Sequence, residues 1–440
     1  MNVLPLRGVC VVAARWTVAF ALTAAAPQAW AQSAAPTSQP QSTPVRPGQV
    51  QPQPGENYDP PGIRMGGFLL YPSLELVEMY NDNVFATTNN RVGKFITVVN
   101  PRVDLKSNWN NHALNLFAAG SVGFYHGASS ENFQDFSVGG SGRLDIQRNW
   151  YLFGGGSFSR RHEERGTPNA LFGPEPNEYF DALANIGYYQ KFNRVFVRAE
   201  GKWEHLSYTN NKSLNIAGVV NNENRNRSEF TETLRAGYEF VEGTELWVQG
   251  GLNQRVYDTR FDNLGFQRSS TGWEIVGGAT VDLGGITQVE GFAGFRTQDY
   301  RDARLGEIRG AIFGLSGTWN PYVPLFIKPY VRRTIEETNI AGYSGYWSTL
   351  AGVNVDYKVR PNIRVSGGAA IGWDDYRLNN QVPGTPDRLD RYLILEIGVK
   401  YQPTENFFVG PSYQYTNRNS DSPGIDFGRN IFMLRGGVQL

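Results

Sequence analysis

The sequence is poor in cysteine, histidine and methionine, with one, four and four of them in 440 residues. A single cysteine cannot close an internal disulfide or build a thiolate metal site. Basic and acidic residues balance at 41 each without a basic block, which excludes the charge pattern of a nucleic-acid-binding protein. Beyond the N-terminus no apolar run reaches about 18 residues, which excludes a bundle of transmembrane helices.

Glycine and aromatic residues are abundant instead. The chain contains 50 Gly and 13% aromatic residues, and its mean hydropathy is −0.40. Its length allows about one to three domains and a sizeable core. The glycine and aromatic content is too high for an ordinary α/β enzyme, so the composition favours another fold class.

The N-terminus has the pattern of a secretory signal. Arg7 and Arg15 precede a short apolar stretch over residues 16–26, and Ala29-Trp30-Ala31 is a small-x-small cleavage site. We predict a signal peptide over residues 1–31, with an apolar N-terminal helix of the fold as the alternative. Since Cys10 lies in this signal, the mature chain would have no thiol.

Residues 32–65 form a segment dominated by Pro, Gln, Ser and Thr. Such a segment has too few apolar residues to offset the entropy lost on ordering. We predict a disordered leader over residues 32–65, for which a docking role stays open, followed by one domain over residues 66–440.

From residue 66 onward, apolar and polar residues alternate with a period of two. In residues 112–125, Leu114, Leu116 and Phe124 alternate with Asn115 and Ser121. Residues 133–148 and 271–283 repeat this pattern. Alternation of this kind indicates strands, and runs of about 10 residues or more suit tilted strands that cross a membrane.

The connections between these runs alternate in length. Short turns rich in Gly, Pro or Asn lie near residues 107–110, 148–150, 192–194, 242–244, 284–285, 320–321, 360–362 and 403–405. Longer polar loops lie at residues 81–93, 126–132, 164–177, 209–226, 258–270, 299–307, 337–344, 377–388 and 419–428. Eight turns and nine loops join 18 strands, which predicts an all-β, transmembrane antiparallel β-barrel with short periplasmic turns and longer extracellular loops. A 16-stranded barrel is the numerical alternative, and a soluble sandwich, propeller or solenoid is the structural one.

Aromatic residues gather at both ends of the predicted strands. Near the short turns lie Trp109, Trp150, Tyr151, Trp319, Tyr322, Tyr357, Tyr401 and Phe407. Near the long loops lie Tyr80, Tyr125, Tyr208, Tyr257, Trp273, Tyr300, Trp373 and Tyr376. We expect two aromatic belts at the two membrane interfaces.

If the apolar face of each strand meets lipid, the polar face lines the lumen. The predicted lumen-lining residues are Arg102, Asp104, Arg143, Asp145, Arg198, Glu200, Lys202, Arg235, Glu239, Glu290, Arg296, Lys328, Arg332, Glu396 and Lys400. A barrel of 18 strands is wide enough to hold water. Because both signs are mixed, we expect passage of polar solutes with weak ion selectivity. Pairing across strands that merely stiffens the wall is the alternative role.

Two segments resemble known signals. The last strand places Phe432, Leu434 and Leu440 on one face, which resembles the C-terminal signal read by the barrel-assembly machinery, although Leu440 stands where an aromatic is usual. Tyr80, Asn81, Asp82, Asn83, Val84 and Phe85 resemble the step into the first loop of the β-barrel porin 2 family of Gram-negative bacteria. The resemblance runs from about residue 66 to the C-terminus and implies an outer-membrane location. Members are often linked to exopolysaccharide systems, which implies polysaccharide passage.

The motif Asn81-Asp82-Asn83 also offers several oxygens. We interpret it as a loop turn, with a divalent-cation site as the weaker alternative. The sequence therefore predicts no metal and no cofactor.

A catalytic site is not indicated. His126, His162 and His205 fall near the loop end, with Glu163, Glu164 and Asp374-Asp375 at the same rim, while His112 falls at a short turn. A His–carboxylate pair could activate water, but no spacing links these residues. There is no Gly-x-Ser-x-Gly elbow and no His-Glu-x-x-His motif.

These patterns predict an outer-membrane channel for passive passage or export of polar solutes, with exopolysaccharide implied by the resemblance. Its expected partners are outer-membrane lipid, the barrel-assembly machinery and a polar solute or polysaccharide, and its oligomeric state is left open. Phe117, Phe292 and Tyr330 are expected to be lumenal aromatics that contact sugars. A closed structural barrel and a rim-located enzyme are the alternatives.

Overall fold

A computed structural model describes residues 60–169, 173–212, 219–283, 286–379, 382 and 384–440. The predicted signal peptide and most of the predicted leader lie outside these residues. Within them, the helical content is two single-turn 3-10 helices, Ser129–Glu131 and Glu223–Arg225. No helix of the described part is long and apolar enough to cross a membrane.

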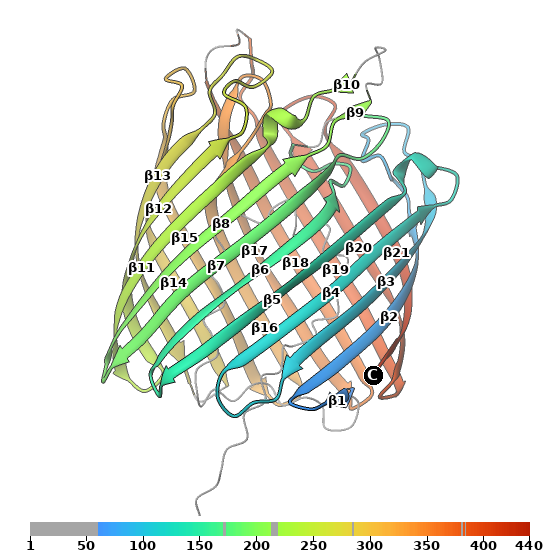
Figure 1. Cartoon of the computed structure of the whole chain (residues 1–440). Helices are drawn as coiled ribbons and strands as arrows, with labels where there is room; N and C mark the ends of the chain where they lie inside the picture. Colours follow the sequence, from blue (N-terminus) through green and yellow to red (C-terminus); the bar gives the residue numbers. More distant parts are fainter. Residues whose placement is uncertain (1–59, 170–172, 213–218, 284–285, 380–381, 383) are drawn as a thin grey trace, which may run out of the picture.

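Eighteen long strands make up the body of the protein (Figure 1). They are β2 (Phe68–Asn81), β3 (Lys94–Ser107), β4 (Ala113–Tyr125), β5 (Phe133–Gln147), β6 (Trp150–His162), β7 (Glu178–Phe192), β8 (Val195–Tyr208), β11 (Arg227–Val241), β12 (Thr244–Tyr257), β13 (Ser270–Asp282), β14 (Thr287–Tyr300), β15 (Ile308–Tyr322), β16 (Leu325–Glu337), β17 (Tyr343–Arg360), β18 (Ile363–Leu378), β19 (Leu389–Thr404), β20 (Phe407–Ser420) and β21 (Phe427–Gln439).

Each long strand pairs antiparallel with its neighbour, and the first and last strands close the ring. Pairs such as Leu76↔Gly436 join β2 to β21, and Thr231↔Lys202 joins β11 to β8 across the longest loop. Figure 1 shows the tilted strands, the short turns at one end with the C-terminus, and the long loops at the other. The predicted barrel and its strand number of 18, not 16, are confirmed.

Three short strands were not predicted. β1 (Ile63–Met65) pairs antiparallel with Phe68–Leu70 of β2, so the sheet extends into the stretch that the sequence assigned to the leader. β9 (Asn211–Lys212) and β10 (Val219–Val220) pair within the β8–β11 loop. All three are too short for a period of two to be recognised.

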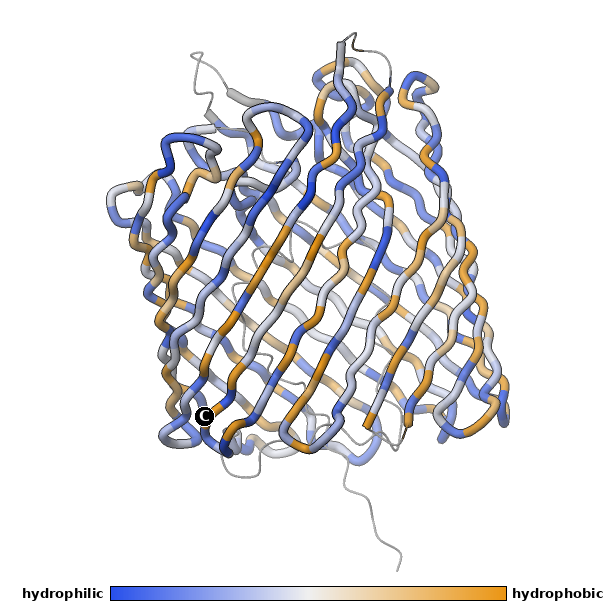
Figure 2. Tube along the Cα trace, turned by 180° about the vertical axis from the view of Figure 1, so that it is seen from behind, coloured by the Kyte–Doolittle hydropathy of each residue, from blue (hydrophilic) through white to orange (hydrophobic). Residues whose placement is uncertain are grey.

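The strand period places apolar side chains outside and polar ones inside. On β11, Leu234 is 58% exposed on the outer face, while its chain neighbour Arg235 points inward. Figure 2 shows this alternation along the strands on the side of the barrel that lies behind in Figure 1. Large exposed apolar side chains over the strands are what a lipid-facing wall requires.

An aromatic residue paired with a glycine recurs on the inner face. In seven of the nine hairpins with a loop-end connection, a ring stands directly opposite a glycine on the next strand: Phe117 and Gly139, Phe153 and Gly187, Phe196 and Gly237, Trp247 and Gly278, Phe292 and Gly314, Tyr330 and Gly352, and Phe408 and Gly437. At each of these glycines a Cβ would come under 3.0 Å from the ring. The remaining two hairpins have only one residue of the aromatic–glycine pair. In one, Tyr71 stands opposite Asp104, and in the other Gly398 stands opposite Ser366. Because glycine has no side chain, each of the seven rings can lie against the backbone of the neighbouring strand.

The expected aromatic belts are only partly correct. Tyr80, Trp273 and Trp373 are exposed on the outer face near the loops. Four other aromatics of the loop-end set, however, are buried: Tyr208, Tyr257, Tyr300 and Tyr376. These rings point inward and pack against loops and inner-face side chains, since position along the chain fixes the height of a residue but strand parity fixes its face.

Candidate functional site

Several predicted lumen-lining residues form ion pairs along a single strand. Arg102 contacts Asp104 at 2.7 Å, and Arg143 contacts Asp145 at 2.8 Å. On β8 the same spacing joins Arg198 to Glu200 at 2.9 Å and Lys202 to Glu204 at 2.8 Å. Residues two apart share one face of a strand, so these pairs need no partner from elsewhere.

Other pairs join strands that are not neighbours. Arg235 on β11 reaches Glu290 on β14 at 3.0 Å. Lys191 on β7 pairs with Glu239 on β11. Side chains of such distant strands converge only on the concave side of a barrel, so these contacts place the polar set inside.

The remaining predicted residues lie on the same inner face. Arg296 lies 3.8 Å from Glu274, and Lys328 lies 2.9 Å from Asp356. Glu396 accepts a 3.2 Å hydrogen bond from Gln414, Lys400 lies 4.2 Å from the centre of the Phe408 ring, and Arg332 lines the cavity described below. Their part in conduction is a proposal taken up in the next subsection.

The β16–β17 hairpin bends into the lumen at its loop end. β15 pairs with β16 from Tyr322↔Leu325 to Phe313↔Arg333, whereas β16 continues with β17 up to Glu337↔Gly345. Above Arg333 the hairpin therefore separates from β15. Glu337 then pairs with Arg255 on β12 and accepts a 3.3 Å hydrogen bond from the Tyr257 hydroxyl, so its side chain lies inside the barrel.

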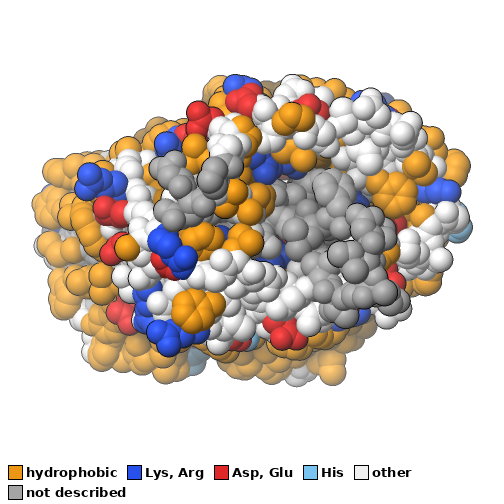
Figure 3. Space-filling view, turned by 90° about the horizontal axis from the view of Figure 1, so that it is seen from above, with side chains coloured by type: hydrophobic (Ala, Val, Ile, Leu, Met, Phe, Trp, Pro, Cys, Tyr) orange, Lys and Arg blue, Asp and Glu red, His pale blue; other side chains and the backbone are white. Residues whose placement is uncertain are grey.

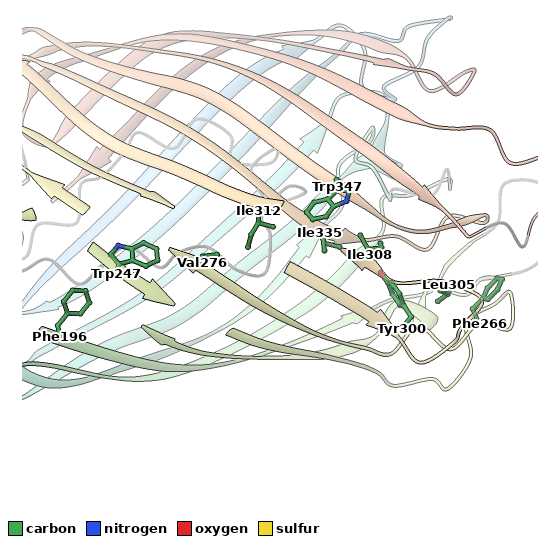
Figure 4. Close-up of a cluster of buried hydrophobic side chains, with 10 residues drawn as sticks. All are labelled: Phe196, Trp247, Phe266, Val276, Tyr300, Leu305, Ile308, Ile312, Ile335 and Trp347. Atoms are coloured by element: carbon green, nitrogen blue, oxygen red, sulfur yellow. The ribbon is translucent and has the colours of Figure 1, made fainter. Parts of the chain in front are cut away.

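Apolar packing holds this hairpin against the inner wall. Ile335 and Trp347 are 1% and 3% exposed and belong to one cluster with Ile308 and Ile312 of β15. Figure 4 shows the cluster extending along one wall, from Phe196 and Trp247 to Leu305 and Phe266 in the loops. On that wall the inner surface is a double layer, which narrows the lumen.

The first part of the β6–β7 loop, residues 163–169, extends across the mouth. The side chain of Asn169 donates a 3.0 Å hydrogen bond to the Glu337 carbonyl and accepts a 2.8 Å bond from the Thr338 hydroxyl. The carbonyl of Gly166, in the same loop, accepts a 3.0 Å bond from Arg418 on β20. Seen from the loop end, described loop side chains extend over the mouth, inside an apolar outer rim (Figure 3).

Ion pairs anchor the start of that loop. Arg165 contacts Glu131 at 2.7 Å, and Arg225 donates to Glu163 at 2.9 Å. Burial alone would lower the pKa of the Arg225 guanidinium, but the Glu163 carboxylate outweighs it and holds that pKa above its ordinary value. The Arg225 guanidinium therefore stays positively charged in this contact.

The family motif lies where the first and last strands meet. Asn83 is fully buried and donates to the carbonyls of Thr87 at 2.8 Å and Gly428 at 3.0 Å. The Asp82 carboxylate accepts two hydrogen bonds from Asn430, at 2.7 and 2.6 Å. The motif thus ties the β2–β3 loop to β21, and both Asp82 carboxylate oxygens serve in these hydrogen bonds.

The rest of the motif packs around this tie. The Asn81 side chain accepts a 2.9 Å bond from the Asn83 N–H. Val84 is buried in a cluster that Phe85 packs against, and Tyr80 contacts Phe95 outside, with the ring centres 5.0 Å apart. Among the described residues, no group of three or more His, Cys, Asp or Glu could hold a metal ion.

The histidines are not brought together. His162 bonds to Asp135 at 2.9 Å, His126 to Thr97 at 2.9 Å and His205 to Ser228 at 2.9 Å. His112 accepts a 3.0 Å bond from the Asp145 N–H at the opposite end of the barrel. The acids that follow His162 contact arginines instead, Glu163 with Arg225 and Glu164 with Arg429.

The inward β16–β17 hairpin and the β6–β7 loop together form a constriction at the mouth. Sequence reasoning missed the residues that hold it. Asn169, Arg255 and Glu337 were not singled out, although they join the β6–β7 loop, β12 and the inward hairpin. Arg255 and Glu337 are charged residues near the loop ends of their strands, where polar residues are common, so no local signal marks them. Their contacts depend on which distant strands face one another.

A closed ring of 18 tilted strands, apolar outside and ion-paired inside, defines a porin-type β-barrel. The family model described as "Putative beta-barrel porin 2" matches residues 56–440, and the chain belongs to that family. The family resemblance found in the sequence is thereby confirmed.

Solved structures that are similar to this chain come from Pseudomonas aeruginosa. OpdO is 14% identical, with 84% of this chain and 97% of that chain covered and a TM-score of 0.43. OccK1 (OpdK) is 12% identical, with 84% and 99% covered and a TM-score of 0.44. The siderophore receptor PirA is 9% identical, with 84% and 80% covered and a TM-score of 0.42. These likenesses concern the fold and not the function. No curated protein sequence matches the chain.

Proposed function

We propose that this protein is an outer-membrane channel through which polar solutes pass passively. The observation that carries the proposal is the inner wall, where ion pairs such as Arg198–Glu200 and Arg235–Glu290 present fixed charges on a closed barrel. A wall of this kind replaces part of the hydration that a polar solute loses on entry. Family membership supports the same function.

Polysaccharide is the proposed cargo class, on the resemblance and on the lumenal rings. Phe117, Phe292 and Tyr330 lie on the inner face, each opposite a glycine, so each ring is held flat along the wall. Flat rings beside charged and amide side chains suit the apolar and hydroxyl faces of sugars. The proposed partners are outer-membrane lipid, the barrel-assembly machinery and this solute.

Solute entry into liposomes tests the proposal. Proteoliposomes of the folded protein should swell in a series of sugars, with rates that fall as sugar size increases because the hairpin and the β6–β7 loop narrow the mouth. Liposomes carrying the heat-unfolded protein are the control. Swelling no faster than in that control, for every sugar, would contradict a passive pore.

A closed structural barrel is the second candidate, favoured by one observation. The contacts of Asn169 and Gly166 hold the β6–β7 loop across the mouth at both of its sides. Under this alternative, Asn169→Ala would leave swelling absent. Under the channel proposal, the same variant should admit larger sugars than the wild type.

A further inference from the structure

The lumen contains a cavity beside the inward hairpin. Together with the part of the lumen that opens onto it, its empty space is about 920 Å³. Strands β8 and β11–β16 supply its lining. It lies below the point where β16 separates from β15, so the hairpin forms its loop-side wall. A solute that enters on this side of the lumen would meet this cavity next to the constriction.

Cations dominate the charged lining of the cavity. Two carboxylates line it, Glu200 and Glu274, against six cations: Arg198, Lys202, Arg235, Arg296, Arg332 and Arg333. This imbalance contrasts with the even charge of the whole chain, from which the sequence predicted weak selectivity. The balanced charge of the whole chain therefore conceals a local excess of positive charge in this cavity.

Carboxylates behind the lining do not remove the excess. Glu204 pairs with Lys202, and Glu290 pairs with Arg235, which brings the opposing carboxylates to four. Glu336, buried near Arg332, adds at most one more negative charge. Arg333 contacts the Thr349 hydroxyl at 3.1 Å and lies 4.7 Å from the centre of the Trp347 ring. The carboxylate that acts on it, Asp375, is itself paired with Arg377 at 2.6 Å.

The neutral part of the lining suits a hydroxylated ring. Trp247 and Phe292 contribute aromatic surface, and Thr231, Thr233 and Gln249 contribute hydrogen-bonding groups. Arg235 stacks on Trp247, with the guanidinium carbon 3.6 Å from the ring centre, which fixes the guanidinium plane beside the cavity. A planar guanidinium held in this way can bind a carboxylate through two hydrogen bonds.

We propose that this cavity is a binding site for the carboxylate of an acidic sugar, with Arg235 and Arg296 as its principal contacts. The proposal deepens the proposed channel function, on which it rests for the route by which the solute arrives. The same carboxylate could belong to a free uronic acid or to a residue of an acidic polysaccharide.

Binding is measured on the folded full-length barrel in detergent, so the readout does not require conduction. Saturation-transfer NMR titrations compare D-galacturonate with D-galactose, which differ in the carboxylate at C6. Galacturonate should bind at least tenfold more tightly, and added NaCl should weaken it because the attraction is between charges. A titration with trigalacturonate separates the two sources, since tighter binding of the trimer than of the monomer indicates a polymer.

Two variants and one matched control test the contacts. Arg235→Gln and Arg296→Gln should each weaken galacturonate binding about tenfold or more and leave galactose binding unchanged. Arg391→Gln removes an ion-paired arginine on β19, away from the cavity lining, and should change neither. The heat-modifiable gel mobility of each variant shows that it is folded.

Equal binding of the two sugars would overturn the carboxylate site, and so would equal effects of Arg235→Gln, Arg296→Gln and Arg391→Gln. Failure of the channel function is a separate result, seen as liposomes that do not swell while galacturonate still binds. Failure of the carboxylate site leaves swelling intact and abolishes the difference between the two sugars.

Discussion

The side chain of Asn83 helps to close the barrel at the loop end. It is fully buried between the β2–β3 loop and β21, and its amide bonds to backbone groups on both sides. The sequence identified this motif as a turn, and the turn prediction is consistent with its local bonds. The tie to Gly428 could not be predicted, because it joins residues 345 positions apart.

Asn83→Ala should lower the stability of the barrel. The substitution leaves buried carbonyl and N–H groups without partners, at a cost of about 2–4 kcal/mol. The measurement is the temperature at which the folded band disappears in heat-modifiability gels. Asn89→Ala, at an exposed position of the same loop, is the control and should leave that temperature unchanged. Equal midpoints for the two variants would contradict the closing role.

Asp302 is a loop residue whose charge ties two loops together. Its carboxylate accepts hydrogen bonds from Arg304 at 2.8 Å and from the Gln267 N–H at 3.0 Å. The bond from Arg304 is the main reason that the pKa of Asp302 lies well below its ordinary value. A carboxyl with a depressed folded-state pKa stabilises the structure above its unfolded pKa, and this contribution is lost as the pH falls through the folded pKa.

The tie between the β12–β13 and β14–β15 loops should therefore persist to a pH below the ordinary titration of aspartate. Exchange of the Gln267 amide should remain slow until the solution is strongly acidic. In Asp302→Asn, exchange should be faster and should not follow this titration. A transition of the wild type at the ordinary aspartate pKa would argue against the assignment.

At the scale of single residues, the sequence indicated on which face of a strand a charged residue lies, but not which residue it pairs with. Strand parity predicted that all fifteen charged positions lie on the inner face, because the period of two is local. It could not show that Arg198 pairs within its own strand while Arg235 reaches three strands away, since that depends on barrel curvature.

Among the elements, the repeated unit is a hairpin with an aromatic ring laid over a glycine. Gly187 is representative, because a Cβ there would overlap the Phe153 ring, which is also stacked under Arg198 at 4.7 Å. The repeat explains part of the high glycine and aromatic content. It was not recognised in the sequence, because the register that pairs the two residues was unknown.

Gly187→Ala should destabilise the barrel by about 1–3 kcal/mol, since the added methyl must displace a packed ring. Gly277→Ala makes the same change on the outer face, where a Cβ meets nothing within 4 Å, and should be neutral or slightly stabilising. Urea-unfolding midpoints in lipid vesicles measure the difference. A Gly277→Ala variant as unstable as Gly187→Ala would refute the role of the rings.

The β16–β17 hairpin is the element that departs most from a regular wall. Its strands were predicted correctly, but its inward bend was not. Ile335 and Trp347 alternate as lipid-facing residues would, and only their contacts with Ile308 and Ile312 show that they are internal. Three very short strands were also missed, for want of enough residues to show a period.

Glu337→Gln should loosen this hairpin and enlarge the passage. The variant weakens the pairing with Arg255 and the bonds from Tyr257 and Tyr300, so we expect a mean conductance at least twofold higher, with more fluctuation. Glu307→Gln removes an exposed carboxylate 3.7 Å from Arg309 and serves as the control. Identical conductance histograms for the two variants would show that the hairpin does not limit flow.

At the scale of the molecule, the parts form one closed cylinder with a polar interior. Balanced charge and low mean hydropathy first excluded other classes of protein, and they result from averaging an apolar outer face with an ion-paired inner face. The sequence predicted this architecture well, because strand period and loop length are local properties. The constriction and the cation-lined cavity arise from contacts between distant strands, so they required the structure.

The most direct test of the central claim is the electrical behaviour of the folded protein in a planar lipid bilayer. We predict discrete, stable conductance steps when single barrels insert, absent from bilayers that receive heat-unfolded protein. Silence in the Asn169→Ala and Glu337→Gln variants as well as in the wild type, across a range of salt concentrations, would contradict a water-filled channel.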